Sequence, residues 1–240
     1  MTTQVVPGKL VAVRDAEIGA EEAAKLFAAV LKKAVEARGF AAMALSGGST
    51  PLPAYRALAK ADVPWDKVKL FWVDDRAVPE SHERSNARSV RAAFGDTRFA
   101  GVFPMDGGAS DLAAGAKAYA ETLAREVPGT TAPTLDLVVL GVGDDGHTAS
   151  LFPGDLAVLD TTSTVIAVPA KGDREARITL GRAVLVEARA SFVLAFGKSK
   201  NGPLESAWSL GGDVTECPAR ITRHFKGSLT WLVDRAAGGI

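Results

Sequence analysis

Short runs of apolar residues, many of them β-branched, recur along the chain between longer stretches rich in alanine and charge. A short run that is apolar throughout predicts a strand buried on both faces of a sheet. The predicted strands are Leu10–Val13, Phe40–Leu45, Val68–Val73, Leu135–Leu140, Val165–Val168, Ser191–Phe196 and Leu229–Val233.

The stretch between the first two predicted strands has helical periodicity. Its apolar face carries Phe27, Val30, Leu31, Ala34 and Val35, and Gly39 is placed to end the helix. Further helices are expected after Thr50, around Asn86, near Ser110 and after Ser199, and residues 236–240 are expected to fray. The alternation of strands and helices predicts an α/β fold with a doubly wound, mainly parallel sheet flanked by helices.

Composition narrows the class of protein. The chain has 240 residues, 47% hydrophobic and 23% charged, as in ordinary globular domains, and we expect residues 1–240 to form a single domain. The 28 basic and 28 acidic residues give a net charge of zero, which argues against nucleic-acid or membrane binding. The start of the chain lacks a secretory signal, and the lone Cys217 allows no intrachain disulfide. We therefore expect a cytoplasmic protein.

In open α/β sheets, ligands bind beyond the carboxyl ends of the strands, so the loops that follow strands are the candidate sites. The first is Ser46-Gly47-Gly48-Ser49-Thr50-Pro51, in which the glycines let the backbone approach a ligand. Thr50 and Pro51 suit the N-cap and first residue of a helix, whose free amides could bind phosphate. A tight turn without a ligand is the alternative interpretation.

The second loop places two acids and an arginine, Asp74-Asp75-Arg76, after a strand, with Ser85-Asn86 further on. A guanidinium group matches phosphate or carboxylate oxygens, and a neighbouring acid can orient it. A surface ion-pair cluster would have the same sequence. Two later segments, Arg177–Leu180 and Gly197–Lys200, could bring Arg177 and Lys200 to the same end of the sheet.

The third loop, Gly141–Gly154, formally matches the G-x-G-x-x-G pattern of dinucleotide-binding proteins, with Asp160 downstream. Asp144 and Asp145 would repel a pyrophosphate, and Pro153-Gly154 leaves little room for the helix that this pattern requires. The loop instead offers His147, a side chain suited to accept and return a proton near neutral pH, two residues after a carboxylate.

Other kinds of catalytic site fit the sequence less well. The Gly-x-Ser-x-Gly sequence of a serine hydrolase is missing, and Cys217 lies in no recognisable nucleophile motif. The two acids and His147 have the spacing of no specific metal motif, so we expect no metal. His224 is interpreted as a structural residue.

Five segments together resemble one known family. They are Ser46–Pro51, Phe71–Pro79 with Ser85-Asn86, Leu135–Gly154, Arg177–Leu180, and Gly197 with Lys200. In this order, and with the specific sequence Asp145-Gly146-His147-Thr148-Ala149-Ser150-Leu151-Phe152-Pro153, the chain resembles the 6-phosphogluconolactonases, within the superfamily that includes the glucosamine-6-phosphate deaminases. The deaminase branch typically continues to Asn-Glu-Pro, whereas Leu151-Phe152-Pro153-Gly154 carries no acid. One departure is Asp75, where the family usually has the longer glutamate.

The resemblance implies a Rossmann-like cytoplasmic hydrolase of the pentose phosphate pathway that converts 6-phospho-D-glucono-1,5-lactone to 6-phospho-D-gluconate. It implies no metal or organic cofactor and no partner beyond this small-molecule substrate, and we expect a monomer or weak homodimer. A deaminase and a non-catalytic sugar-phosphate sensor are the competing functions.

We expect each site residue to have one of two roles. The catalytic residues are His147, which activates water, Asp145, which orients His147, and Asp74, which positions donors or water. No covalent intermediate is required. The remaining residues bind the 6-phosphate and orient the lactone: Ser46, Gly47, Gly48, Ser49, Thr50, Arg76, Arg177 and Lys200.

Overall fold

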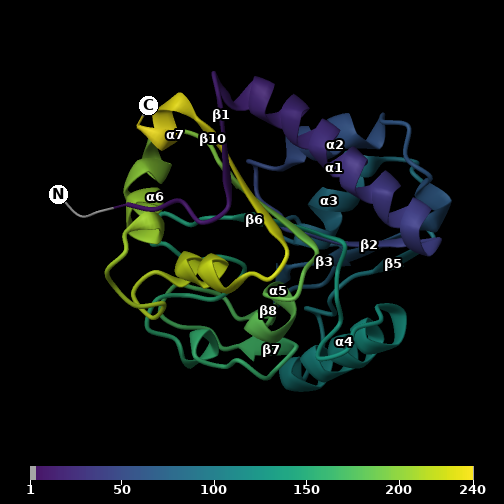
Figure 1. Ribbon diagram of the computed structural model, residues 1–240. Helices are drawn as coiled ribbons and strands as arrows, with labels where there is room; N and C mark the ends of the chain where they lie inside the picture. Colours follow the sequence, from purple (N-terminus) through teal and green to yellow (C-terminus); the bar gives the residue numbers. More distant parts are fainter. Residues whose placement is uncertain (1–3, 240) are drawn as a thin grey trace.

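A seven-stranded sheet runs through the centre of the molecule in the computed structural model, which describes residues 4–239 (Figure 1). Every neighbouring pair of strands in this sheet is parallel. In spatial order the strands are β1 (Lys9–Val13), β10 (Ser228–Asp234), β9 (Ala190–Ala195), β6 (Leu137–Gly141), β2 (Ala41–Leu45), β3 (Val68–Trp72) and β5 (Gly101–Phe103). The predicted α/β fold with a mainly parallel sheet is confirmed.

Helices cover both faces of this sheet (Figure 1). The α-helices are α1 (Ala16–Arg38), α2 (Leu52–Ala59), α3 (Asn86–Phe94), α4 (Leu112–Glu126), α5 (Arg182–Leu185), α6 (Asn201–Trp208) and α7 (Arg235–Gly238). Four short 3-10 segments are η1 (Trp65–Lys67), η2 (Leu156–Val158), η3 (Lys198–Lys200) and η4 (Pro218–His224). The long helix α1 begins where the Asp15 carboxylate accepts from the Ile18 amide at 3.0 Å and ends at Gly39, whose φ of 79° suits glycine.

A second sheet of three antiparallel strands lies beside the first, in the order β4 (Asp74–Arg76), β8 (Arg177–Leu180), β7 (Val165–Val168). The prediction of a fully buried strand at Val165–Val168 is wrong in one respect. This strand forms an edge of the small sheet, and most of its residues are half-buried. Its apolar side chains pack partly against α4, so a continuous apolar run did not require burial on both faces.

Two local predictions also need correction. Pro51, not Thr50, occupies the N-cap position of α2, with no capping hydrogen bond from its side chain. The tail expected to fray contains α7, because the Asp234 carboxylate accepts from the Ala237 amide at 2.8 Å; residue 240 lies outside the described residues. Among residues 4–239, no helix is long and apolar enough to cross a membrane.

The strand order reverses between β2 and β6, which makes their boundary the position where an open α/β sheet binds ligands. From β2 the chain proceeds to β3 and β5 on one side, and from β6 to β9 and β10 on the other. The Ser46 amide donates to the Val139 carbonyl at 3.2 Å, so the two strands stay paired up to this boundary. The fully buried β2 and the aromatic side chains of Trp72 and Phe27 form part of the core beneath it.

Candidate active site

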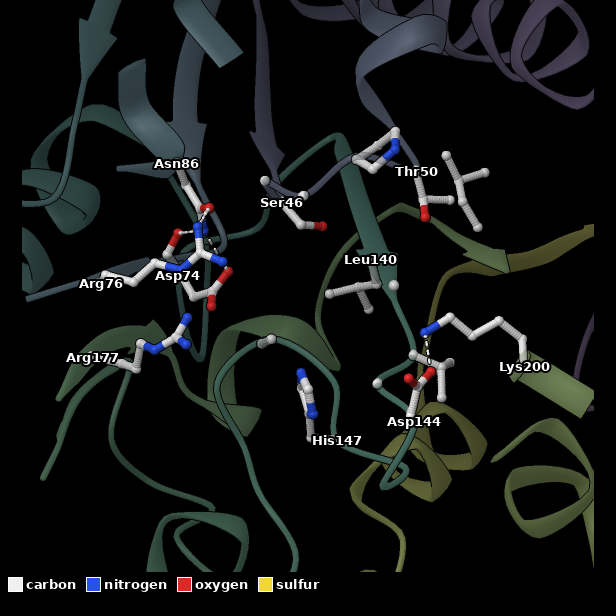
Figure 2. Close-up of a pocket in the computed structure, with 18 residues that line it drawn as sticks. Ser46, Thr50, Asp74, Arg76, Asn86, Leu140, Asp144, His147, Arg177 and Lys200 are labelled. Atoms are coloured by element: carbon white, nitrogen blue, oxygen red, sulfur yellow. Dashed lines mark hydrogen bonds and ion pairs between the residues drawn. The ribbon is translucent and has the colours of Figure 1, made fainter. Parts of the chain in front are cut away.

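A cavity of about 330 Å³ opens at the carboxyl ends of β2 and β6, where the three predicted loops meet (Figure 2). Its lining residues come from both sheets: Ser46, Gly47, Gly48, Thr50, Pro51, Asp74, Arg76, Asn86, Leu140, Gly141, Val142, Gly143, Asp144, His147, Ala149, Arg177, Leu194 and Lys200. Most of the predicted site residues are therefore brought together. Ser49 lines a neighbouring hollow beside α1, and Asp145 reaches the cavity through its contact with His147.

His147 and Asp145 form a hydrogen-bonded pair. Nδ1 of His147 lies 2.5 Å from Oδ1 of Asp145, which also accepts from the His147 amide at 3.0 Å. Burial works against ionisation of Asp145, but the hydrogen bonds from His147 and its charge together hold the pKa of this carboxyl below its ordinary value. An ionised Asp145 that accepts from Nδ1 leaves the other ring nitrogen of His147 free to act as a base.

The imidazole ring of His147 is enclosed on two sides. A Cβ added at Gly143 would lie 2.0 Å from Nδ1 of His147, so glycine is required there. On another side the Phe152 ring packs at 4.5 Å between centroids, with the Arg174 guanidinium 4.1 Å above it. Close by, Ala149 has a φ of 51°, the only positive value at a non-glycine residue among positions 4–239. This local strain accompanies the tight course of the loop around His147.

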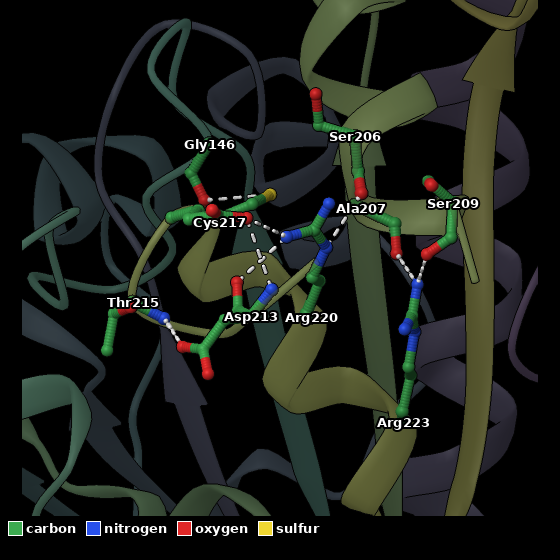
Figure 3. A network of polar contacts seen from close by, with 10 residues as sticks. Gly146, Ser206, Ala207, Ser209, Asp213, Thr215, Cys217, Arg220 and Arg223 are labelled. Atoms are coloured by element: carbon green, nitrogen blue, oxygen red, sulfur yellow. Dashed lines mark hydrogen bonds and ion pairs between the residues drawn. The ribbon is translucent and has the colours of Figure 1, made fainter. Parts of the chain in front are cut away.

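The segment 213–223 supports this loop from below (Figure 3). The Ala219 amide donates to the Gly146 carbonyl at 3.0 Å, and the buried Cys217 lies so close that a Cβ at Gly146 would come within 2.8 Å of its sulfur. Arg220, only 7% exposed, donates to the carbonyl oxygens of Ser206 and Asp213 at 3.0 and 2.8 Å. Cys217 is therefore a packing residue against the loop that carries His147.

Asp74 is buried at the edge of the cavity and held by hydrogen bonds from two segments. Ser150 of the His147 loop donates its hydroxyl to Oδ2 at 2.5 Å. The side-chain amide of Asn86 donates to Oδ1 at 3.3 Å and to the Asp74 carbonyl at 2.9 Å. These contacts fix the direction of the carboxylate relative to the loop that carries His147.

Asp75 points away from the cavity and stabilises the start of α3. Its carboxylate accepts from the amides of Asn86 and Ala87 at 2.7 and 2.8 Å and from the Ser85 hydroxyl at 3.0 Å. Burial raises the pKa of Asp75, and these hydrogen bonds oppose the rise. Although Asp75 is shorter than the glutamate usual in the family, its carboxylate therefore reaches all of these donors.

Three cationic side chains reach the cavity. Arg76 and Arg177 face each other across the β4–β8 pair and lie on one side of His147 in Figure 2, with Lys200 on the other. Burial lowers the pKa of Arg177, Asp74 opposes this effect and the neighbouring Arg76 adds to it. Lys200 donates to Oδ1 of Asp144 at 2.7 Å. Two adjacent guanidinium groups of like charge favour an anion between them.

The glycine loop forms the upper wall of the cavity. Gly48 has a φ of 90°, and at Gly47 a Cβ would lie 1.9 Å from Oδ1 of Asn86, so both positions require glycine. The Ser46 hydroxyl donates to the Val139 carbonyl at 2.5 Å, and the Ser46 carbonyl accepts from the Tyr55 hydroxyl at 3.0 Å. Because the Ser46 hydroxyl already donates to the backbone, it has no proton left to donate to a ligand. Ser46 therefore contributes mainly to the shape of the loop.

Sequence reasoning did not assign roles to Asn86 or Asp144, although both line the cavity. The only signal for Asn86 in the sequence is its place in the family pattern, and Asp144 enters the sequence argument only as a charge that would repel pyrophosphate. His224 is exposed and lies outside the lining. Within the described part of the chain, no group of three or more His, Cys, Asp or Glu side chains could hold a metal ion.

The chain is similar to known proteins in both sequence and structure. The chain is 39% identical over 213 residues to a 6-phosphogluconolactonase of Synechocystis, covering 87% of this chain and 88% of that protein. It is 36% identical over 236 residues to a 6-phosphogluconolactonase of Mycobacterium tuberculosis, covering 93% and 94%. A crystal structure of a 6-phosphogluconolactonase from Shewanella baltica superposes with a TM-score of 0.86 at 27% identity, covering 97% of this chain and 99% of that one.

A monomeric glucosamine-6-phosphate deaminase shares the fold, with a TM-score of 0.81 at 20% identity over 96% of this chain and 99% of that one. The family model described as glucosamine-6-phosphate isomerases/6-phosphogluconolactonase matches residues 14–231, which confirms the resemblance found in the sequence. The chain therefore belongs to the glucosamine-6-phosphate isomerase/6-phosphogluconolactonase family.

Proposed function

We propose that this protein hydrolyses 6-phospho-D-glucono-1,5-lactone to 6-phospho-D-gluconate in the oxidative pentose phosphate pathway. The observation that carries the proposal is the His147–Asp145 pair in a cavity that also holds Arg76, Arg177 and Lys200. A base beside several cations suits a neutral, hydrolysable ring attached to a phosphate group. The names of the relatives support the same substrate.

In the proposed reaction, His147 takes a proton from water with the ring nitrogen that does not face Asp145. The resulting hydroxide forms a bond to C1 of the lactone. When the bond between C1 and the ring oxygen breaks, His147 returns the proton to that oxygen, so no covalent enzyme intermediate forms. Asp145 stabilises the charged imidazolium between the two transfers, and Asp74 positions the water or a substrate hydroxyl.

In this proposal the 6-phosphate is held by the backbone amides of residues 47–50, in the loop that Ser46 begins, together with Arg76, Arg177 and Lys200. Binding of the phosphate places C1 of the lactone beside His147, so that the binding energy orients the reacting carbon. Asp144 forms an ion pair with Lys200, so a bound phosphate would compete with this carboxylate. The predicted monomeric or weakly dimeric state stays a prediction.

The deaminase alternative has less support from the loop after His147. In the described structure the side chain that packs on the imidazole ring is Phe152, and the following Pro153-Gly154 adds no carboxylate. A deaminase would need a further acid to assist opening of the sugar ring. The His147 environment therefore favours hydrolysis.

The test is hydrolysis of freshly generated 6-phosphogluconolactone, corrected for the spontaneous rate, by wild type, His147→Ala and His224→Ala. We expect wild type and His224→Ala to be equally fast and His147→Ala to lose about 100- to 10,000-fold in kcat with little change in KM. Wild type at the spontaneous rate would reject the lactonase, and ammonia release from glucosamine 6-phosphate would then indicate the deaminase. A fast His147→Ala variant would reject the histidine mechanism.

A further inference from the structure

The side chain of Asn86 uses both ends of its amide on residues of the cavity. Its Nδ2 donates to Asp74, at 2.9 Å to the carbonyl and at 3.3 Å to the carboxylate, and its Oδ1 accepts from Nη1 of Arg76 at 2.6 Å. Asn86 is only 3% exposed, so water cannot replace these partners. One neutral side chain thus connects Asp74 to the guanidinium group of Arg76, both on β4.

The position of Asn86 is itself fixed from two other directions. As the first residue of α3, it donates its backbone amide to Oδ1 of Asp75 at 2.7 Å. Gly47 lies against the Asn86 side chain, because a Cβ there would come 1.9 Å from Oδ1 of Asn86 and 2.3 Å from its Cγ. The glycine loop, β4 and α3 therefore all meet at this one amide, and Figure 2 shows its contacts with Asp74 and Arg76.

We propose that Asn86 is a positioning residue for the reaction, which directs the Arg76 guanidinium and the Asp74 carboxylate into the cavity. An amide suits this role because it donates at one end and accepts at the other. Arg76 has one further acceptor, the Arg84 carbonyl at 2.8 Å, which alone fixes only one direction of the guanidinium plane. The turnover part of this inference rests on the proposed lactonase function.

The first experiment is a double-mutant cycle between Asn86→Ala and Arg76→Ala, measured by kcat and KM for the lactone. If Asn86 acts through Arg76, its removal raises KM about 10-fold or more in wild type but has a much smaller effect once Arg76 is gone. Equal effects in the two backgrounds would overturn this half of the proposal. Thermal unfolding of each variant shows whether it is folded, and Asn86→Ser replaces Asn86→Ala if the latter is not.

The second experiment tests the donor to Asp74 with Asn86→Asp. This change keeps an acceptor for Arg76 but replaces the donating NH₂ group with a carboxylate that faces the Asp74 carboxylate. The other charged groups around position 86 are Asp75, whose carboxylate accepts from the backbone amide of Asn86, and Arg177 of β8, which is paired with Arg76 and lines the same cavity. The variant should therefore be impaired at pH values where the introduced carboxyl is ionised and cannot donate to Asp74.

The Asn86→Asp variant should regain activity as the pH falls. Once protonated, the introduced carboxyl can donate to Asp74 as the amide does. The adjacent carboxylates favour this protonation, and the Arg76 guanidinium, which donates to the same position, opposes it. We expect the ratio of kcat/KM between Asn86→Asp and wild type to rise several-fold from about pH 8 to about pH 5.5. Gln4→Glu, the same change at an exposed amide, should give a ratio near one at every pH. A reduced ratio for Asn86→Asp that does not change with pH would indicate a merely structural role.

Titration with inorganic phosphate separates failure of this inference from failure of the lactonase proposal. If wild type does not hydrolyse the lactone, the proposed function fails, but weaker phosphate binding by Asn86→Ala than by wild type still supports positioning of Arg76. If wild type is active while Asn86→Ala keeps its KM, kcat and phosphate affinity, the lactonase stands and the positioning role of Asn86 is wrong.

Discussion

At the scale of single residues, the close contact between Gly143 and His147 determines where the base points. An added Cβ at Gly143 would lie 2.0 Å from Nδ1 of His147 and 2.8 Å from Oδ1 of Asp145. The backbone at Gly143 also donates to the His147 carbonyl at 2.8 Å, so this part of the loop cannot simply move aside. A methyl group would therefore separate the histidine from its carboxylate.

We predict that Gly143→Ala lowers kcat by about 100-fold or more, because it displaces the base without removing it. The protein should remain folded, since the clash involves side-chain atoms at the edge of the cavity. Steady-state kinetics and circular dichroism check both statements. The matched control is Gly202→Ala in α6, where nothing lies within 4 Å of the new Cβ, and it should keep full activity. A Gly143→Ala enzyme as active as this control would show that the ring has more freedom than the contacts imply.

His147 and Asp145 could be predicted as a pair because two positions in one loop suffice to bring them together. Asn86 and Ser150 could not be assigned roles in this way, since their hydrogen bonds to Asp74 span 12 and 76 positions in the chain. Such contacts depend on how β4, α3 and the third loop pack. The sequence pattern therefore pointed to the side chains proposed to react but not to the side chains that hold them.

At the scale of elements, Asp75 joins β4 to the start of α3. Its carboxylate accepts from three backbone amides, those of Arg76, Asn86 and Ala87. An asparagine would present an NH₂ group to one of these donors. The orientation of α3, and with it that of Asn86, therefore depends on a carboxylate at position 75.

We predict that Asp75→Asn lowers the free energy of unfolding by about 1–3 kcal/mol, because it leaves a buried amide without an acceptor. Urea unfolding measures the loss, and Asp96→Asn at an exposed position should change little. Since burial raises the pKa of Asp75, the native state binds this proton more tightly than the unfolded state. The advantage of wild type over Asp75→Asn should thus grow as the pH falls from about 7 toward the ordinary pKa of aspartate. If the difference in unfolding free energy shrank over this range, the hydrogen bonds to Asp75 would have a larger effect on its pKa than burial has.

The long periodic elements were predictable, whereas the three-residue strands β4 and β5 were not. Three residues carry too little of a two-residue repeat to be recognised, and Asp74-Asp75-Arg76 is a polar sequence that joins a sheet only because β8 pairs with it. For Val165–Val168 the bounds were predicted correctly and only the burial was wrong. Its sequence predicted an extended conformation correctly, but its neighbours in space decided which sheet it joined.

At the scale of the whole molecule, the cavity lies where the two sheets meet. Val73 links them directly: its amide donates to the Leu45 carbonyl at 3.0 Å, and its carbonyl accepts from the Leu180 amide at 2.8 Å. The lining takes His147 and Lys200 from loops of the large sheet and Arg177 from the small one. A ligand that filled this cavity would contact residues of both sheets.

We therefore predict that 6-phosphogluconate shifts one cooperative thermal transition of the whole chain, as expected if residues 1–240 form a single domain. At a concentration of 100 times Kd, binding adds about 2.7 kcal/mol to the native state, which corresponds to a rise in Tm of about 5–11 °C for a chain of this size. Gluconate, which lacks the phosphate, should produce a much smaller rise at the same concentration. Scanning calorimetry with each ligand measures the shift. Two transitions, of which the product moves only one, would mean that the sheets unfold separately and that the contacts at Val73 do not couple them.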